Sequence, residues 1–427
     1  MAEQTTGSGP FGFLPRDPEE LHAFLADLRE NKPVHQIPPA GVWAITRYED
    51  VVHVLKHHEL FSSEALRTMG MGMAGITADS LETSLSSDNA AVLFRTTPTV
   101  ITADPPRHGR LRNIVNRGFT PSRIERVAPR IREITTELLD DVVARGEMEL
   151  MSDLAVPLPV TVIAELLGVA PERGDDFKRW SDLFISTLAQ MPDAETFKQI
   201  EAAMQEFAEY FDEVVQERRR RPTDDLVSTI VHAETEDGAL SNVEVLAFCR
   251  LLLIAGNETT TNLLARMMMT LLDHPDQLAK LRADLSLLPN AVEETLRYAG
   301  VVPALPRLTT QEVEVGGVKI PSGQIVLPFF MAANRDPRRF PDPDRFDITR
   351  KTTGHLAFGF GAHFCLGAHL ARLETRIAME GVLGRLPNFR IARTSEEKHV
   401  LTGQAEAIYL EFDEGQTGGG RVEVPGA

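Results

Sequence analysis

The amino-acid sequence predicts a mainly α-helical chain with small β-sheets, in the α+β class. Apolar residues recur at spacings of three and four over most of the chain, as they do in residues 21–28 and 131–142. One helical pattern runs without a proline from Ser241 to the residue before Pro275. Runs with the character of strands are few and short. Together these observations indicate helices as the main structure and sheets as a minor one.

The longest helix candidate begins at Ser241. Glu244 follows at the spacing of a capping box, in which the two residues satisfy each other's free backbone amides. The pattern continues to Pro275, so the helix would span about 32 residues and about 48 Å. Polar residues inside it, Asn257 and Glu258 among them, argue against a membrane helix. We therefore expect a central helix that crosses a large domain.

Four short runs rich in β-branched and apolar residues predict strands. They are residues 42–46, 313–315, 324–327 and 407–411. Gly316 and Gly317 follow one of these runs, and two glycines between strand-like segments are typical of a tight hairpin turn. The sheets are therefore expected to be small.

No linker rich in proline, glycine or serine divides the chain. We expect a flexible N-terminus over residues 1–10, a single domain over 11–413 and a flexible tail over 414–427. The net charge of −18 disfavours nucleic acid and anionic membranes as partners. A run of four arginines at 218–221 is interpreted as the solvated C-terminal end of a helix, where the macrodipole favours cations.

Cysteine usage points to a reducing compartment. The only two cysteines, Cys249 and Cys365, exclude a disulfide framework. The chain begins without the pattern of a signal peptide and has no apolar run of membrane-spanning length. The expectation is a cytoplasmic protein without a membrane anchor.

The segment from Phe358 to Gly367 places Cys365 in a loop punctuated by glycines, just before a helical pattern. Gly359 and Gly361 would allow positive φ angles that bring backbone amides close to the sulfur. A thiolate is a strong ligand of haem iron, and a helix N-terminus stabilises its charge. A cysteine in such a loop, taken alone, is more often a buried structural residue. The complete ten-residue pattern is much more specific.

This segment resembles the haem-binding loop of the cytochrome P450 superfamily, Phe-x-x-Gly-x-x-x-Cys-x-Gly, at every fixed position. The resemblance implies the cytochrome P450 fold, with haem b buried between a long central helix and the helix after the cysteine loop. It implies Cys365 as the metal ligand. Further cofactor-binding residues in the loop are Phe358, Gly359, His363 and Gly367. Matching motifs follow in family order from about residue 40 to 412, which is nearly the whole chain.

A polar segment, residues 255–260, interrupts the apolar long helix. The Thr259 hydroxyl can bond the carbonyl of Ala255, four residues earlier, and bend the helix there. A solvent-facing patch is the alternative, but the apolar flanks favour a functional or paired acid at Glu258. The segment resembles the superfamily's Gly-x-Asp/Glu-Thr motif. This implies catalytic roles, with Thr259 stabilising the bound, reduced oxygen and Glu258 relaying protons, while Asn257 fills a variable position.

Four basic residues lie at positions where the superfamily binds the haem propionates. They are His108, Arg112, Arg307 and His363, and the resemblance implies Ala255 as a further cofactor contact. Each one alone is more often a surface charge. His108 and Arg112 are four residues apart, which puts both on one face of a helix.

Glu294 and Arg297 form an i, i+3 pair on a predicted helix, which by itself is an ordinary surface ion pair. The resemblance implies instead that the pair is structural and locks the core together with a downstream arginine. Arg345 matches that partner.

The resemblance favours a monooxygenase that inserts one atom of O2 into a mostly apolar small molecule, such as a terpene, steroid, fatty acid or macrolide-like compound. A peroxygenase or rearrangement enzyme on the same fold is the first alternative, but such members usually lose the acid–threonine pair. A haem-thiolate sensor or electron carrier is the second, although the apolar stretch 69–94 is suited to line a substrate cavity. Expected pocket residues are Met71, Phe94, Leu251, Ile254, Ala255, Val301 and Val302, with the turn 401–403.

The chain has no flavin or dinucleotide fingerprint and no cysteine cluster for an iron–sulfur centre. We therefore expect a ferredoxin and its reductase to supply the electrons. We also expect the protein to be a monomer. Candidate docking residues on the Cys365 side are Arg110, Arg117, His369 and Arg372.

Overall fold

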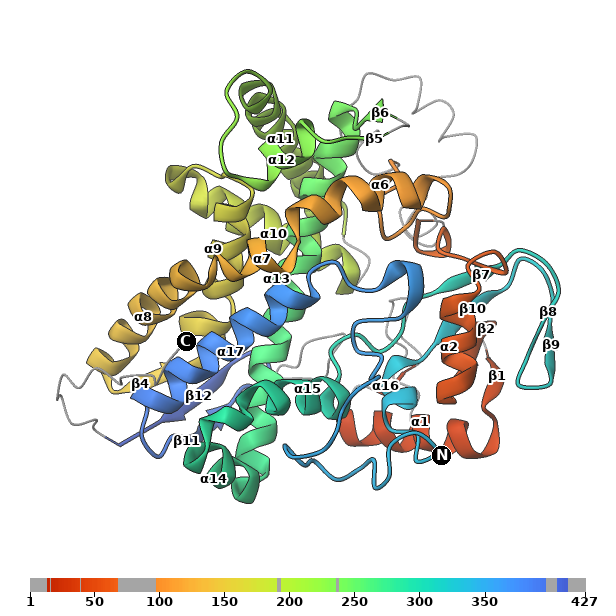
Figure 1. Cartoon of the computed structure of the whole chain (residues 1–427). Helices are drawn as coiled ribbons and strands as arrows, with labels where there is room; N and C mark the ends of the chain where they lie inside the picture. Colours follow the sequence, from red (N-terminus) through yellow and green to blue (C-terminus); the bar gives the residue numbers. More distant parts are fainter. Residues whose placement is uncertain are drawn as a thin grey trace.

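The structure is a computed structural model that describes residues 14–15, 17–38, 40–67, 97–189, 193–235, 238–396 and 405–413. The expected flexible ends, the pocket residues Met71 and Phe94, and the turn 401–403 lie outside the described residues. The predicted fold class is confirmed, because helices dominate and the sheets are small (Figure 1).

The helices follow one another along the chain with few strands between them. They are α1 (Pro18–Asn31), α2 (Tyr48–Lys56), α6 (Arg107–Val115), α7 (Pro121–Glu125), α8 (Ala128–Arg145), α9 (Pro157–Leu166), α10 (Gly174–Ala189), α11 (Ala194–Arg220), α12 (Leu226–Val231), α13 (Asn242–Asp273), α14 (Pro275–Ala283), α15 (Leu288–Ala299), α16 (Phe330–Asn334) and α17 (Ala368–Arg385). Short 3-10 or π segments lie at η1 (Asn116–Gly118), η2 (Met151–Ala155), η3 (Pro171–Arg173), η4 (Leu285–Leu287) and η5 (Gly361–His363).

Among the described residues, the strands form one five-stranded sheet, one three-stranded sheet and two hairpins. The five-stranded order is β1 (Val34–Ile37), β2 (Val42–Ile45), β10 (Ile325–Pro328), β7 (Arg307–Thr309) and β3 (Phe61–Ser62). The three-stranded order is β11 (Arg390–Thr394), β12 (Ile408–Glu411) and β4 (Glu147–Glu149); the hairpins are β5 (Glu234–Thr235) with β6 (Gly238–Ala239), and β8 (Val313–Val315) with β9 (Val318–Ile320). The pair β2–β10 is parallel and the other pairs are antiparallel.

The predicted strands and hairpin are confirmed. Each of the four runs overlaps a strand, and the turn between β8 and β9 is formed by Gly316 and Gly317. Their φ angles are +55° and +79°, in the left-handed region that favours glycine. The two residues that the turn joins, Val315 and Val318, are directly paired.

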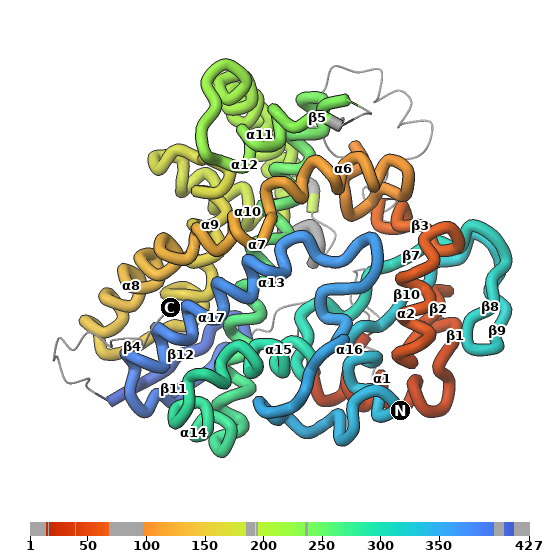
Figure 2. The backbone as a smooth tube through the Cα atoms, in the orientation of Figure 1, coloured from red at the N-terminus to blue at the C-terminus, as the bar shows by residue number. Residues whose placement is uncertain are grey.

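The long helix α13 runs through the middle of the molecule, as the sequence predicts. It spans 32 residues, and the capping box of Ser241 and Glu244 closes its N-terminus. Helices α9, α10, α11, α15 and α17 all pack against it, and α17 crosses it in Figure 2. Most of its side chains are buried in the largest hydrophobic core of the protein, which explains how so long a helix is stabilised.

Within the part of the chain that the structure describes, no helix combines the length and apolar character needed to cross a bilayer.

Candidate active site

The loop around Cys365 has the backbone geometry that its glycines predict. Gly359 and Gly361 both have φ of +72°. A Cβ atom on Gly361 would lie 3.0 Å from the carbonyl oxygen of Leu55, so only glycine fits between the loop and the end of α2. The Cys365 amide donates a 2.8 Å hydrogen bond to the Phe358 carbonyl, which closes the loop on itself.

The Cys365 sulfur lies at the start of α17, which has Gly367 at its N-cap. Burial raises the pKa of the Cys365 thiol, whereas the Gly367 amide and the positive charges of Arg112 and Arg372 act to lower it. A Cβ atom on Gly367 would meet nothing within 4 Å, so the backbone borders open space here. The structure thus places the half-buried Cys365 near two cations, at a helix N-terminus and beside an open face.

Four basic side chains from three distant segments converge beside this loop. The imidazole rings of His108 on α6 and His363 in the loop lie 4.3 Å apart between centroids. Burial, together with the nearby charges of Arg307, His108 and Arg112, lowers the pKa of His363 to about 3. Arg307, on β7, is 4% exposed, and burial lowers its pKa to about 10. These are the four predicted propionate-binding residues, and the fold brings them together.

This cluster has the properties of a site for an anionic group. The buried Nε2 of His108 has no hydrogen-bond partner among the described residues. Asp104, which binds Ser62 and the Ser63 amide, is the acid whose charge acts on Arg307. Because burial lowers the pKa of both histidines, the positive charge of the cluster comes from Arg112 and Arg307, and Asp104 is one carboxylate for these two guanidinium groups. This leaves positive charge, and the N–H groups of the histidines, for further carboxylates to bind. The residues present therefore fit a haem, whose two propionates would supply them.

The acid–threonine segment lies at the middle of α13. The Thr259 hydroxyl donates a 2.7 Å hydrogen bond to the Ala255 carbonyl, as predicted. The amide group of Asn262 donates to the Glu258 carboxylate at 2.9 Å. Ala255 is exposed and Thr259 is half-buried, so this side of α13 borders open space rather than a neighbouring helix.

The described members of the expected pocket set are Leu251, Ile254, Ala255, Val301 and Val302. Leu251 and Ile254 lie on α13 and are half-buried against the main core. Val301 and Val302 follow α15 and are also half-buried, against two different core clusters. The four larger side chains offer apolar surface without being sealed into the core.

The Glu294–Arg297 pair is fully buried. Two hydrogen bonds of 2.8 Å join the guanidinium to the carboxylate, and Arg297 also donates to the carbonyls of Asn334 and Pro343. The prediction that Arg345 is the third member of this group was wrong. Its side chain is 64% exposed, 3.7 Å from Asp347, and only its carbonyl accepts from Arg297.

The guanidinium of Arg350 takes the predicted place of Arg345, 3.1 Å from Glu294. Arg350 also donates to the carbonyls of Pro341, Asp342 and Arg345. The segment between Phe340 and Arg350 is irregular, so spacing along the sequence did not indicate which of its arginines points inward.

Replacing Arg297 by alanine is expected to lower the free energy of unfolding by about 3–5 kcal/mol, because it leaves the Glu294 charge buried without its main partner. Replacing Arg345 by alanine is expected to change it by less than about 0.5 kcal/mol, because that side chain is exposed. Urea unfolding of both variants measures the difference. A large loss with Arg345→Ala would restore the original assignment.

A buried acid that the sequence did not indicate lies behind the α13 segment. Glu374 on α17 is 2% exposed, and its Oε2 has no hydrogen-bond partner among the described residues. Burial raises its pKa to about 8, although a hydrogen bond with Thr260 of α13 acts in the opposite direction. At neutral pH, Glu374 is therefore held in its protonated form, next to the residue that follows Thr259.

The raised pKa of Glu374 predicts a loss of stability with rising pH. Between pH 4.5 and about 8 the folded state keeps this proton and the unfolded state releases it, so unfolding becomes easier as pH rises through that window. The loss is at most about 1.4 kcal/mol per pH unit. The variant Glu374→Gln is expected to lose this pH dependence of the free energy of unfolding. The control variant Glu380→Gln, at a more exposed position of α17, is expected to keep it. Urea unfolding at pH 5 and pH 8 tests this, and equal slopes for wild type and Glu374→Gln would contradict it.

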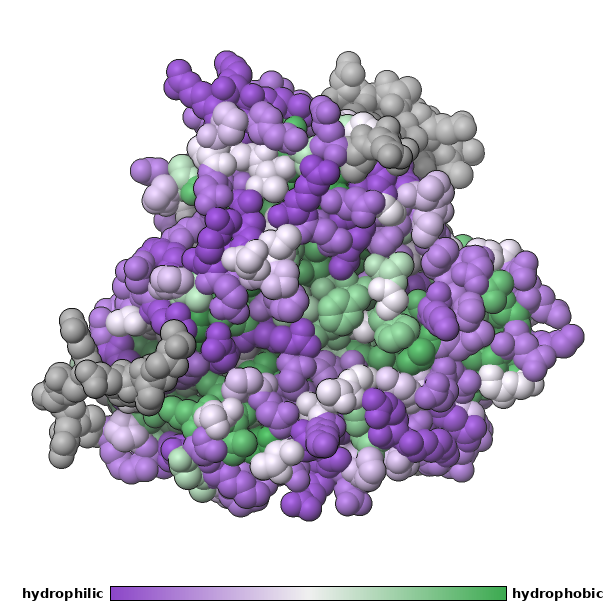
Figure 3. All heavy atoms as spheres, in the orientation of Figure 1, coloured by the Kyte–Doolittle hydropathy of each residue, from purple (hydrophilic) through white to green (hydrophobic). Residues whose placement is uncertain are grey.

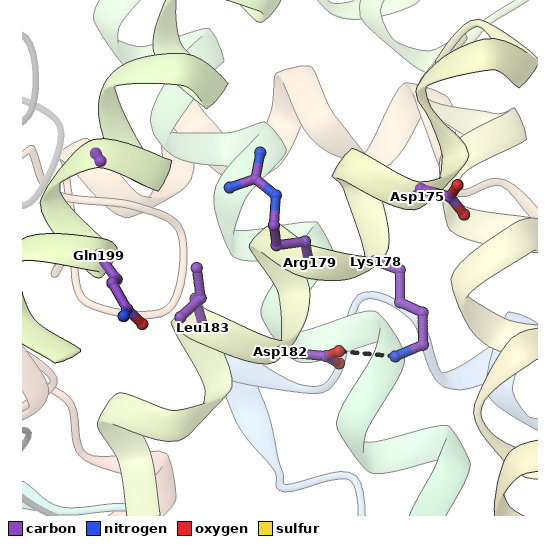
Figure 4. A pocket seen from close by; sticks show the side chains of 7 residues that line it. Asp175, Lys178, Arg179, Asp182, Leu183 and Gln199 are labelled. Carbon is purple, nitrogen blue, oxygen red and sulfur yellow. Dashed lines mark hydrogen bonds and ion pairs between the residues drawn. The ribbon is translucent and has the colours of Figure 1, made fainter.

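A surface hollow of about 620 Å³ lies between α10 and α11, and no residue of the Cys365 loop lines it (Figure 4). Charged residues line it, but they pair with one another, as Lys178 does with Asp182 at 2.7 Å. Arg179 likewise binds Asp176 and Glu206. This hollow has none of the chemistry that the Cys365 site offers.

Comparison with known proteins agrees with the site. The family model described as "Cytochrome P450" matches residues 172–403. The chain is 41% identical to cytochrome P450 107B1 of Saccharopolyspora erythraea over 92% of its own length and 95% of that protein. It is 40% identical to 6-deoxyerythronolide B hydroxylase of the same organism, over 85% and 87%. It is also 40% identical to vitamin D(3) 25-hydroxylase of Pseudonocardia autotrophica, over 92% and 93%.

The fold comparison gives the same result. The structure of cytochrome P450 CYP109Q5 from Chondromyces apiculatus matches with a TM-score of 0.79 at 42% identity, covering 92% of this chain and 95% of that one. Fold and site thus define a haem-dependent oxidoreductase. The chain belongs to the cytochrome P450 family and is a monooxygenase.

Proposed function

We propose that this monooxygenase binds haem b through the Cys365 thiolate and inserts one atom of O2 into a mostly apolar small molecule. The observation that carries the proposal is the convergence of His108, Arg112 and Arg307 on His363, two residues before Cys365. Such a cluster suits the two carboxylates of protoporphyrin IX, and the adjacent cysteine suits axial ligation of its iron.

The haem, when bound, supplies the iron centre at which oxygen is activated. The protein positions the reacting groups. The Ala255 carbonyl fixes the Thr259 hydroxyl, whose oxygen keeps its capacity to accept a proton or a hydrogen bond. Glu258, held by Asn262, passes protons from water towards Thr259. The small side chain of Ala255 leaves room on the same face of α13.

The substrate class follows from the side chains around that space. Leu251, Ile254, Val301 and Val302 are apolar, and none of them adds a charge that would bind a polar substrate. Two relatives are named as hydroxylases of vitamin D(3) and of 6-deoxyerythronolide B. We therefore expect a large apolar compound of the steroid or macrolide kind, ahead of terpenes and fatty acids.

A spectral titration of the purified holoenzyme tests the substrate class. The panel contains vitamin D3, testosterone, 6-deoxyerythronolide B, palmitoleic acid and a monoterpene, with a free amino acid as the polar control. At least one of the first three is expected to shift the Soret band, and the amino acid is not. A shift with the amino acid alone would contradict an apolar substrate.

We propose a ferredoxin, served by its reductase, as the electron donor, docking on the Cys365 side. Figure 3 shows hydrophobic side chains gathered in the middle of this face, between α6 and the start of α17. Phe360 and Phe364, on either side of the loop, are 40% and 39% exposed. Arg117 and His369 are exposed and form the proposed rim of this surface, although one N–H group of Arg117 donates to the Glu234 carbonyl at 2.8 Å.

The other two candidate docking residues are half-buried and paired with carboxylates of the protein. Arg110 binds Glu244 and the Ala239 carbonyl. Arg372 forms two hydrogen bonds with Glu293, of 2.6 and 2.9 Å, and lies over the ring of Phe358. We therefore propose that Arg117 and His369 contribute more to docking than these two arginines.

Reversing charge at the rim, in the double variant Arg117→Glu/His369→Glu, is expected to slow reduction by ferredoxin about tenfold at low salt. The exposed positive charge of the rim attracts the electron donor to this face, although the chain as a whole carries a net charge of −18. Reversing that charge removes the local attraction, whose range is short in salt. Stopped-flow reduction measures the rate, and substrate affinity should not change. The control is Lys198→Glu on α11, which is 75% exposed and far along the chain. Equal rates in both variants would place docking elsewhere.

A further inference from the structure

The residue before Glu258 makes a buried contact with another helix. The side-chain amide of Asn257 donates a 2.7 Å hydrogen bond to the Ser181 hydroxyl of α10. Asn257 is 3% exposed and Ser181 is fully buried. Two polar side chains buried at a helix–helix contact stabilise the fold only when they satisfy each other, so this bond selects one arrangement of the two helices.

Thr261 strengthens the attachment on the same face of α13, one turn after Asn257. Its hydroxyl donates to the Ala155 carbonyl of η2 at 2.8 Å and lies 3.3 Å from Oδ1 of Asn257. Asn257 and Thr261 therefore attach α13 to two separate elements, α10 and η2, which both pack against it. We call this set of bonds the Asn257 strap.

The strap lies across the helix from the reactive face. At 3.6 residues per turn, Thr259 is about 200° around the axis from Asn257, while Ala255 and Thr259 share one face. Rotation of α13 by about 10° would move side-chain atoms on both faces by about 1 Å in opposite directions. Such a rotation would break the 2.7 Å bond to Ser181, so the bond opposes it.

Placement of the reactive groups matters at this scale, since a displacement of about 1 Å can change a rate by about 100-fold. We propose that Asn257 is a positioning residue, which fixes the rotation of α13 through Ser181 and so holds Glu258 and Thr259 at the reaction site. This role rests on the proposed function of that pair. An asparagine at position 257 is then required by its hydrogen bond to Ser181 of α10 and not by the substrate.

The alternative is that the strap only stabilises the fold. Single variants do not separate the two roles, because Asn257→Leu leaves the Ser181 hydroxyl buried without a partner, and Ser181→Ala does the same to the Asn257 amide. Replacing both partners by apolar groups removes the unsatisfied atoms, and such double replacements regain most of the lost stability. The double variant Ser181→Ala/Asn257→Leu therefore keeps the fold and the Thr261–Ala155 bond, and it lacks the bond between α13 and α10.

The test compares wild type, both single variants and the double variant as holoenzymes, with the titration compound of highest affinity. Melting temperature is expected to fall in the single variants and to recover in the double variant. The fraction of electrons recovered in product is expected to fall severalfold in all three. Amide exchange with deuterium over residues 255–262 is expected to be severalfold faster in the double variant. Thr270→Val, a buried hydroxyl later in α13, is the control and should leave both coupling and exchange unchanged.

Wild-type coupling and wild-type exchange in the double variant would overturn the proposal and leave the strap a purely structural contact. Thr259→Ala is measured in parallel to test the proposed function itself. If that variant retained full coupling, the function assigned to the pair would be wrong. The exchange of residues 255–262 would still decide whether the strap positions α13.

Discussion

Replacing Cys365 by alanine is expected to abolish the long-wavelength Soret band of the reduced, carbon monoxide-bound protein, together with all monooxygenase activity. That band is typical of thiolate ligation, and the chain has only two cysteines. Cys365 lies at the N-terminus of α17, beside an open face and two positive charges. The absorbance spectrum of the reduced protein under carbon monoxide measures this directly.

Cys249→Ala is the matched control for this prediction. Cys249 is fully buried on α13, and burial raises the pKa of its thiol far above the ordinary range, which disfavours a thiolate. The variant should lose some stability and keep the band. A band that persisted in Cys365→Ala and disappeared in Cys249→Ala would overturn the assignment of the iron ligand.

Replacing Thr259 by alanine is expected to uncouple electron use from product formation by about tenfold or more, while substrate still binds. The hydroxyl that donates to the Ala255 carbonyl at 2.7 Å is lost, and with it the oxygen that accepts a proton or a hydrogen bond at the reaction site. Electrons are then expected in hydrogen peroxide. Simultaneous measurement of NADPH consumption, product and peroxide gives the partition.

Thr259→Ser keeps the hydroxyl and should retain most of the coupling, whereas Glu258→Gln should slow turnover through proton delivery. The serine variant separates loss of the hydroxyl from loss of the methyl group. If Thr259→Ala and Thr259→Ser gave the same coupling, or if all variants matched wild type, the proton-delivery role would be rejected. A peroxygenase would then be the better interpretation.

The local features of the site could be predicted because each depends on a few neighbouring residues. Positive φ at Gly359 and Gly361, the capping box at Ser241, and the bond from Thr259 to Ala255 are all set within about one helical turn. The strands and the hairpin at Gly316 followed from the same kind of short pattern.

Contacts between distant segments could not be obtained in this way. Arg345 and Arg350 are five residues apart in an irregular segment, and only the packing of that segment against α15 decides which guanidinium reaches Glu294. The burial of Glu374 depends on the contact of α17 with α13. Asn257 had been given no role, because its partner Ser181 is on another helix.

The sequence by itself therefore determined the helical class, the long central helix, and the cysteine loop with its acid–threonine counterpart. Hydrogen bonds and backbone angles within a turn depend on adjacent residues, and the chain order carries that information directly. The tertiary structure alone decided that Arg350 completes the buried ion group and that Asn257 binds α10. It also supplied the contact at His363 between His108, Arg112 and Arg307, which the family resemblance had already grouped. Burial removes water from these groups, so their energies depend on which distant segment packs against them.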